Sequence, residues 1–183
     1  MTYAEICDAV AKIKRKYDES DPFRLCQALG IKLIFQPMGK DPDAVKGFFL
    51  ESKRIRTITI NSDLPEIIQR IIVAHEICHA IYHRKSGIHA FHEIALFDQN
   101  SAMEKDANLF ASEFLLSDED VFDVLNRDTT FFSGAAALYV PAELLDFKFR
   151  LMKWKGYKLI EPPINARSNF LRDIDIPEDT DYA

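Results

Sequence analysis

The strongest restriction on the fold of this chain comes from residues 71–83, which read IIVAHEICHAIYH. Three of the chain's five histidines lie on this stretch, at positions 75, 79 and 83. Residues four apart share one face of an α-helix, and the other positions of the stretch are nearly all apolar. The pattern therefore predicts a helix over residues 64–84 that begins after Asp63 and is buried at the centre of a domain.

His75, Glu76 and His79 form the pattern H-E-x-x-H, in which each residue type has a separate chemical use. Two imidazoles four residues apart can bind one zinc ion, because both can reach it at the ~2.0–2.1 Å of a zinc–nitrogen bond. Glu76 lies beside them and can take a proton from water without being a ligand. The alternative is a set of core histidines satisfied by ordinary hydrogen bonds. We predict a zinc site with Glu76 as the general base.

A catalytic zinc site needs a third protein ligand, and its fourth position is left for water. His83 lies ~12 Å along the helix axis from His75, too far to share its ion, so we expect it to pack in the core or to support a ligand. An acid on a helix predicted for residues 101–116 should complete the site, and Glu104 is the best placed. Ser101 and Glu104 also fit a capping box, in which Glu104 would only stabilise the helix start.

Other residues are candidates for supporting roles around this site. Asn108 lies one turn after Glu104 and can hydrogen-bond the far nitrogen of a ligating histidine. Asp106 and Glu93 are reserve ligands. The residues that could donate a hydrogen bond to the carbonyl oxygen under attack are unranked: Tyr82, His83 and Tyr139.

Two segments resemble the ImmA/IrrE metallo-endopeptidase family, a group of gluzincin-like proteases. Residues 75–83 (HEICHAIYH) are similar to its HELGHxLLH, and residues 104–111 (EKDANLFA) are similar to its E-x-E-A-N-x-F-A, in the same order. Weaker similarity extends over about residues 20–160. Cys78 stands where the family has Gly and Asp106 where it has a second Glu, but neither change removes a catalytic atom. Because Cys78 directly precedes His79, we expect it to point away from the metal and into the core.

The resemblance implies a zinc-dependent endopeptidase in which His75, His79 and Glu104 hold Zn²⁺ and Glu76 is the general base. It also implies a protein substrate, typically a helix-turn-helix transcriptional repressor of a mobile element or a stress regulon. One alternative is a regulator that binds and sequesters its repressor partner without cutting it, using zinc only to stabilise the fold. A toxin or antitoxin that acts by sequestration is another. The substrate peptide is expected to extend along a sheet edge, for which the strand of residues 56–60 is the candidate.

The rest of the chain predicts an α+β fold. A small, mostly antiparallel sheet should pack against the helix of residues 64–84, and its strands are predicted at 31–36, 47–50 and 56–60. The other helices are predicted at 3–17, 23–29, 101–116, 118–125 and 141–155. We expect a zincin-like metallopeptidase domain over residues 1–160, closed by a strand at 157–160, and an irregular acidic tail over residues 161–183. The tail is either a solvating end or a cover for the active-site groove.

Charge and composition exclude several classes of function. The net charge of −6 and the pI of about 5.4 argue against direct binding to nucleic acid or to an anionic membrane. No apolar run approaches ~18 residues, and the three cysteines are widely spaced. We therefore expect a cytoplasmic protein without disulfides or membrane spans.

The segment of residues 147–158 mixes five basic residues with aromatic ones, as a nucleic-acid-binding stripe would. Helical spacing favours an ordinary amphipathic helix instead, with charged residues in water and apolar residues in the core. The predicted sides are Lys148, Lys153 and Lys155 toward solvent, and Leu144, Leu151 and Trp154 toward the core.

Overall fold

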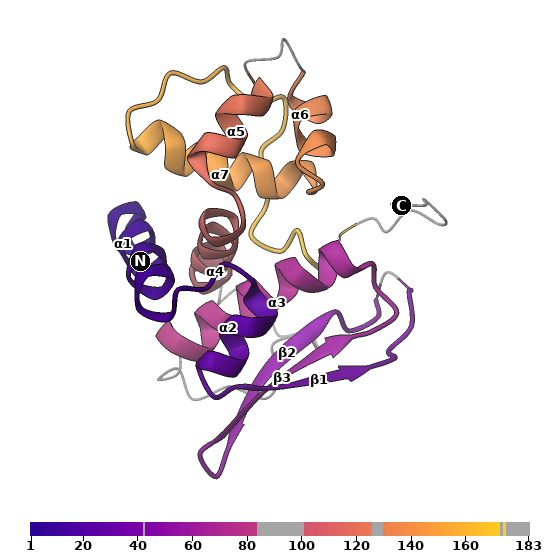
Figure 1. The fold of residues 1–183 in the computed structure, drawn as a ribbon. Helices are drawn as coiled ribbons and strands as arrows, with labels where there is room; N and C mark the ends of the chain where they lie inside the picture. The colour runs from indigo at the N-terminus through magenta and orange to yellow at the C-terminus, as the bar shows by residue number, and fades with distance from the viewer. Residues whose placement is uncertain (42, 84–100, 126–129, 173, 175–183) are drawn as a thin grey trace.

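The computed structural model describes residues 1–41, 43–83, 101–125, 130–172 and 174. Its elements follow the order α1 (Tyr3–Tyr17), α2 (Pro22–Ala28), β1 (Lys32–Gln36), β2 (Gly47–Ser52), β3 (Ile55–Asn61), α3 (Glu66–Tyr82), α4 (Ser101–Leu115), α5 (Asp118–Leu125), α6 (Phe131–Ala137) and α7 (Ala142–Trp154). The sheet lies at one end of the molecule and α5, α6 and α7 lie at the other, with α3 and α4 between them (Figure 1). The predicted α+β class is confirmed.

The sheet is mixed rather than strictly antiparallel, with the strand order β1-β3-β2. β2 and β3 form an antiparallel hairpin closed by Lys53 and Arg54, which both have positive φ angles, as a two-residue hairpin turn requires. β1 pairs parallel with the other side of β3. β3 is therefore the central strand, and its buried residues Ile58 and Ile60 face the core. The prediction that this strand offers a free edge to a substrate is wrong, because both of its sides are already hydrogen-bonded.

Helix α3 is buried around nearly its whole circumference, as the apolar sequence predicted. It packs on both β2 and β3. The approach to β2 is close enough that a Cβ on Gly47 would lie 2.5 Å from Cγ2 of Ile72. The helix begins at Glu66, with Pro65 at the N-cap position. Asp63 does not cap it and instead accepts a hydrogen bond from the backbone N–H of Gly39 at 2.8 Å.

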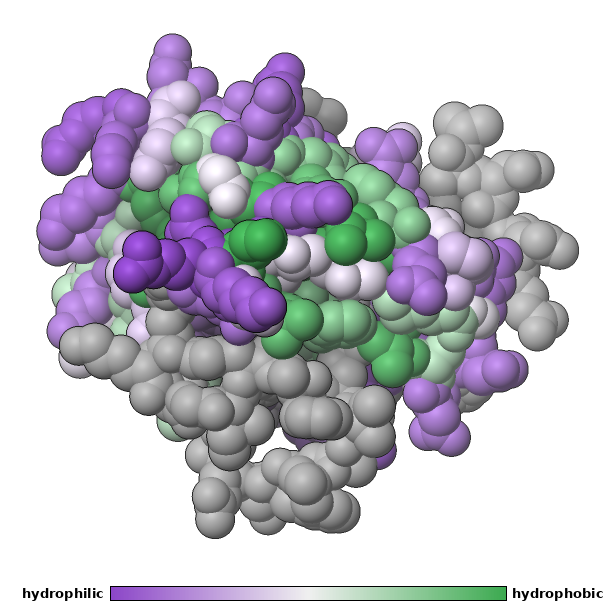
Figure 2. All heavy atoms as spheres, turned by 90° about the horizontal axis from the view of Figure 1, so that it is seen from below, coloured by the Kyte–Doolittle hydropathy of each residue, from purple (hydrophilic) through white to green (hydrophobic). Residues whose placement is uncertain are grey.

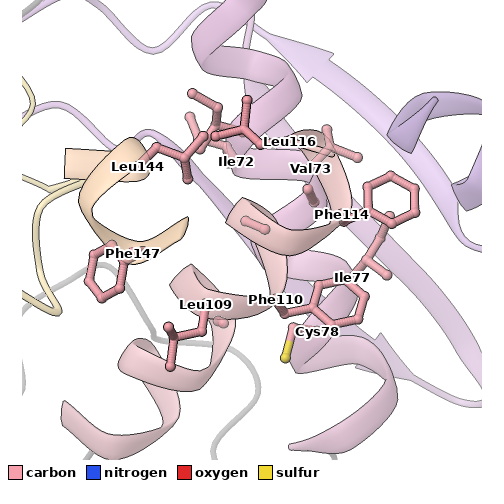
Figure 3. Close-up of a cluster of buried hydrophobic side chains, with 14 of the residues drawn as sticks. Ile72, Val73, Ile77, Cys78, Leu109, Phe110, Phe114, Leu116, Leu144 and Phe147 are labelled. Atoms are coloured by element: carbon pink, nitrogen blue, oxygen red, sulfur yellow. The ribbon is translucent and has the colours of Figure 1, made fainter. Parts of the chain in front are cut away.

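Helices α3, α4 and α7 share one hydrophobic core. Figure 3 shows side chains from the three helices converging, with Ile77 and Cys78 of α3 close to Phe110 of α4 and with Leu144 and Phe147 supplied by α7. Cys78 is fully buried in this core, where the sequence placed it. The packing of α3 on α4 matters for function because it sets which side chains of the two helices face each other.

The predicted orientation of α7 is wrong at two of its residues. Lys148 is only 1% exposed, although it was expected in solvent, and Trp154 is 51% exposed, although it was expected in the core. Lys148 can be buried because its ammonium contacts the carboxylates of Glu113 and Asp118 at 2.7 and 2.6 Å. Helical periodicity cannot foresee such partners, because they come from other elements.

The C-terminal part differs from the prediction in further ways. Helix α6 was not predicted, because its sequence FFSGAAA is short and contains Gly134; Thr130 caps its start. Residues 157–160 form no strand, and the sheet that could pair with one lies at the far end of the molecule (Figure 1). Residues 161–172 are irregular, yet Ala166 and Phe170 are buried. None of the described helices has the length and apolar character needed to span a membrane.

Candidate metal centre

Three side chains that can bind a metal meet between α3 and α4. Nε2 of His75 lies 3.0 Å from Nε2 of His79 and 3.2 Å from Oε2 of Glu104, and Nε2 of His79 lies 3.4 Å from Oε1 of Glu104. Ligand atoms that surround one tetrahedral ion at ~2.0–2.1 Å are about 3.3 Å apart. These residues therefore fit a single metal ion with one coordination position left over, and no other group of three such ligands occurs in the part of the chain that the structure describes.

The packing of α3 on α4 removes these groups from water. His75, Glu76 and His79 are 5%, 5% and 4% exposed, because the apolar residues around them fill the core on the other sides of α3. Glu104 lies in the first turn of α4 and approaches from the more open side. A buried polar group is costly unless it has a partner, and the partners of His75 and His79 are each other, Glu104 and side chains next to the cluster.

His75 is oriented by Asn108, the residue predicted for this role. Nδ1 of His75 lies 2.8 Å from Oδ1 of Asn108, which is fully buried one turn after Glu104 on α4. The hydrogen bond holds the imidazole so that Nε2 points at the other two ligand atoms. The structure thus brings both Glu104 and Asn108 of α4 to His75.

His79 is supported by His83, the third histidine of the helix. Nδ1 of His83 lies 2.9 Å from Nδ1 of His79, and Nε2 of His83 lies 3.9 Å from Oδ2 of Asp106. Asp106 also accepts a hydrogen bond from the amino group of Met1 at 2.5 Å. Asp106, which was predicted only as a reserve ligand, is therefore not part of the cluster of three side chains. It projects from a different side of α4 than Glu104 and lies beside His83.

The electrostatics of the cluster follow from burial and from its acids. Burial disfavours the charged imidazolium of His75, but its hydrogen bond to Glu104 and the charges of Glu104 and Glu76 outweigh burial and raise its pKa above the usual value. Burial has the larger effect at His83 and lowers its pKa. Burial also raises the pKa of the Cys78 thiol well above its usual value, so this cysteine behaves as a core residue.

Not every predicted residue reaches the cluster. The ring of Tyr82 packs on Phe110, with ring centroids 6.2 Å apart, and Tyr139 is 62% exposed between α6 and α7. Glu93 and the side chain of Ser101 lie outside the described residues, so the capping-box alternative for Glu104 stays open. The sequence reasoning missed one participant, the backbone carbonyl of Ser168, which accepts a hydrogen bond from Asn108 at 2.6 Å. A carbonyl in an irregular segment leaves no signal in a sequence.

Comparison with known proteins assigns the chain to a family. A family model described as Peptidase_M78, IrrE N-terminal-like domain, matches residues 26–150. The chain belongs to this family. The match covers α3 and α4 and therefore all three clustered ligands, and the resemblance to the ImmA/IrrE proteins is confirmed. Membership of the IrrE N-terminal-like family supports a metallopeptidase-type role.

A curated relative agrees with the family assignment. The chain is 32% identical over 146 residues to "Uncharacterized immunity region protein 2" of Bacillus phage phi105. The aligned part covers 80% of this chain and 90% of the phage protein. The likeness therefore extends well beyond the two short motifs to nearly the whole length of the relative.

Proposed function

We propose that this protein is a zinc-dependent endopeptidase that cleaves a helix-turn-helix transcriptional repressor of a mobile element or a stress regulon. The observation that carries the proposal is the convergence of His75, His79 and Glu104 on one buried point, with Glu76 next to it on the same helix. The family assignment supports a peptidase, and the donor set, two imidazoles and one carboxylate, is one that zinc hydrolases use.

The metal would be held by Nε2 of His75, Nε2 of His79 and the carboxylate of Glu104. A histidine that binds through Nε2 carries its proton on Nδ1, so His79 donates to Nδ1 of His83 over the 2.9 Å between them. His83 then turns its own Nε2–H toward Asp106. When bound, zinc polarises the scissile carbonyl and makes water more acidic.

Glu76 is the group that moves the proton in this proposal. Its carboxylate is buried, and it belongs to the residue that directly follows His75 on α3. We propose that Glu76 accepts a proton from the attacking water and then donates it to the leaving amine of the peptide. The donor to the carbonyl oxygen stays a prediction among Tyr82, His83 and Tyr139.

The substrate peptide is proposed to lie extended along an edge of the sheet, where main-chain pairing gives affinity with little demand on sequence. β3 is the central strand, and Gly47, Phe49 and Glu51 of β2 have partners of their own, so β1 is the remaining edge strand among the described residues. Hydrophobic residues gather across the middle of the face seen from below, with hydrophilic residues above them and at both sides (Figure 2).

The choice of a repressor as substrate is supported by the phage relative. Its name places it in an immunity region, which fits action on a repressor. We propose that the reaction takes place in the cytoplasm and involves no direct contact with nucleic acid, in keeping with the net charge of −6. The division into a peptidase domain over residues 1–160 and a tail over 161–183 stays a proposal as well.

The test is to replace Glu76 by Gln and to incubate wild type and variant, both loaded with zinc, with the repressor encoded nearest to the gene. Wild type should produce discrete fragments, and Glu76→Gln should lower the rate at least ~100-fold while keeping its zinc, because general acid–base catalysis supplies about 10²–10⁴-fold. Glu66→Gln, a change of the same type at an exposed position of the same helix, should cut normally.

The same assay separates cleavage from sequestration. A stable complex without fragments, formed equally by wild type and Glu76→Gln, would support the sequestering regulator instead. Full turnover by Glu76→Gln would refute the assignment of the base but not of the metal site, which zinc analysis of both proteins checks independently.

A further inference from the structure

The segment that follows α7 is held against the helical part of the molecule at several points. We call residues 161–172 the C-terminal strap. Arg150 of α7 donates to Oδ1 of Asn165 at 2.8 Å and to the carbonyl oxygen of Ala166 at 2.7 Å. The N–H of Ala166 donates to Asp146 at 3.0 Å, and the ring of Phe170 packs on Phe147 with centroids 5.6 Å apart.

These anchors place the carbonyl of Ser168, which lies between Ala166 and Phe170, beside the metal centre. Nδ2 of Asn108 donates to this carbonyl oxygen at 2.6 Å, while Oδ1 of the same amide lies 2.8 Å from Nδ1 of His75. Asn108 is fully buried, so the two contacts replace water at both of its polar atoms. The strap thus reaches a proposed metal ligand through one side chain.

The chemistry of these atoms allows one arrangement of protons. A carbonyl oxygen only accepts hydrogen bonds, so the atom of Asn108 that faces Ser168 must be the NH₂ group. The atom that faces His75 is then the amide oxygen, which also only accepts, and Nδ1 of His75 must carry the proton. In the neutral imidazole, the form that binds a metal, this is the one N–H, and Nε2 keeps its lone pair. Nε2 is the atom that points at His79 and Glu104.

We propose that the C-terminal strap is a positioning element of the metal centre. The Ser168 carbonyl sets the orientation of the Asn108 amide, and the amide sets the tautomer of His75 that can bind a metal. The inference rests on the proposed function, since it takes His75 as a ligand. The strap lies beyond residues 26–150, which the family model matches, so the contact comes from the part of this chain outside that match.

The experiment is a double-mutant cycle between Phe170→Ala, which loosens the strap, and Asn108→Asp, with zinc affinity measured by competition with a chelator. In the Asn108→Asp protein both side-chain oxygens accept, so the tautomer of His75 no longer depends on Ser168. We expect Phe170→Ala alone to raise the zinc Kd about tenfold, at the lower end of the ~10–100-fold that support of a ligand contributes. We expect Phe170→Ala to change the zinc Kd less than ~2-fold when it is added to Asn108→Asp, because that variant has already lost the hydrogen bond to Ser168.

Two further measurements guard against loss of folding in Phe170→Ala. Arg150→Gln removes the hydrogen bonds to Asn165 and Ala166 in the middle of the strap, whereas Lys153→Gln removes the same charge from the same helix and breaks an ion pair with Glu161 at the exposed end of the strap. Arg150→Gln should weaken zinc binding, and Lys153→Gln should not. In the metal-free protein, at a pH high enough for the His75 ring to be neutral, its ¹⁵N shifts should report Nδ1–H in wild type and a mixture with Nε2–H in Phe170→Ala.

The outcomes separate this inference from the metal site itself. If Phe170→Ala and Arg150→Gln bind zinc as wild type does, or if Phe170→Ala weakens binding equally in both backgrounds, the strap does not act through Asn108 and the inference fails. If wild type binds no zinc, or if His75→Ala leaves its affinity unchanged, the proposed metal site fails first. That result is recognised without any strap variant.

Discussion

Two buried clusters of ionisable side chains touch α4, and they are built in opposite ways. In the charge cluster, formed by Lys148, Lys155, Glu113 and Asp118, each ammonium lies 2.6–2.9 Å from oxygens of both carboxylates. Every positive group there meets negative ones, and the side chains range from 1% to 23% exposed. Four groups of alternating charge satisfy one another without help from any other species.

The metal centre places like groups together instead. His75, His79 and Glu104 turn electron-pair donors toward one another at 3.0–3.4 Å, and Asn108 holds the proton of His75 on the far side of its ring. Electron-pair donors that converge in this way repel unless a proton or a metal ion lies between them. Burial of charged and polar residues therefore does not by itself indicate a functional site. The useful indication is whether the groups that face each other have opposite charges or are all electron-pair donors.

The largest expected effect concerns the acid of the metal centre. Glu104→Gln should weaken zinc binding more than ~100-fold, which exceeds what supporting residues contribute, and should reduce cleavage to background. The metal-free protein should keep its stability within about 1 kcal/mol, because the side chain of Glu104 is 27% exposed and its amide replacement can still hydrogen-bond the imidazole of His75. Metal analysis after dialysis and denaturant unfolding with chelator present measure the two quantities. Stoichiometric zinc in Glu104→Gln would remove Glu104 from the ligand set.

The second effect concerns Glu113, another acidic residue of α4, and should be a loss of stability. Glu113→Gln should lower the free energy of unfolding by about 3–5 kcal/mol, because it leaves the ammonium of Lys148 buried with only one carboxylate. Glu119→Gln, an exposed acid on α5, is the control and should change stability by less than about 0.5 kcal/mol. Urea unfolding measures both. Equal effects of the two substitutions would mean that the charge cluster is not a structural unit.

A smaller effect should separate the clusters by pH. Burial alone would raise the pKa of Asp118, but its hydrogen bonds to Lys148 and Lys155 lower it overall. A carboxyl group with a lowered folded pKa stabilises the protein above its unfolded pKa, about 3.9, and loses this stabilisation as the pH falls through the folded value.

Metal-free wild type should therefore be more stable than Asp118→Asn at pH 6, and the difference should shrink as the pH falls below about 4. Thermal unfolding of both proteins over this range measures the difference. A difference that stays constant down to pH 3 would show that the charge of Asp118 contributes nothing.

The smallest effect tests whether Cys78 is a ligand of the candidate metal centre. Cys78 directly precedes His79 but packs in the core near Phe110 (Figure 3). Cys78→Ala should cost about 1 kcal/mol of stability through a small cavity and should leave the zinc stoichiometry and affinity unchanged. A change in the absorption spectrum of the cobalt-substituted protein between wild type and variant would place a sulfur among the ligands.

Local patterns carried most of the prediction at the metal centre. His75, Glu76 and His79 lie on one helix, so their relative placement follows from helical geometry alone. Glu104 and Asn108 lie on a second helix and share a face for the same reason. Helical periodicity does not show how the two helices pack against each other. The prediction that Glu104 lies near the histidines therefore depended also on the resemblance to the motifs of a known family.

Non-local pairing explains where the prediction was wrong. β1 runs parallel to β3 because the connection between β1 and β2 carries the chain to the opposite edge of the sheet, which strand propensity does not encode. Lys148 can be buried because the carboxylates of Glu113 on α4 and Asp118 on α5 lie 2.7 and 2.6 Å from its ammonium nitrogen. Trp154 is exposed because α7 turns its charged side toward those acids.

The amino-acid order alone predicted which side chains of this protein could bind a metal or move a proton, since helical periodicity and residue type place two imidazoles and a carboxylate on one buried helix. Tertiary structure decided the rest, because those features join atoms far apart in the chain. It made β3 the central strand, it paired the buried lysines, and it brought the carbonyl of Ser168 to Asn108, 60 residues away. The chemistry of a side chain follows from its residue type and its neighbours in the sequence, whereas the hydrogen-bond partner of a backbone carbonyl in an irregular segment depends on the packing of the whole chain.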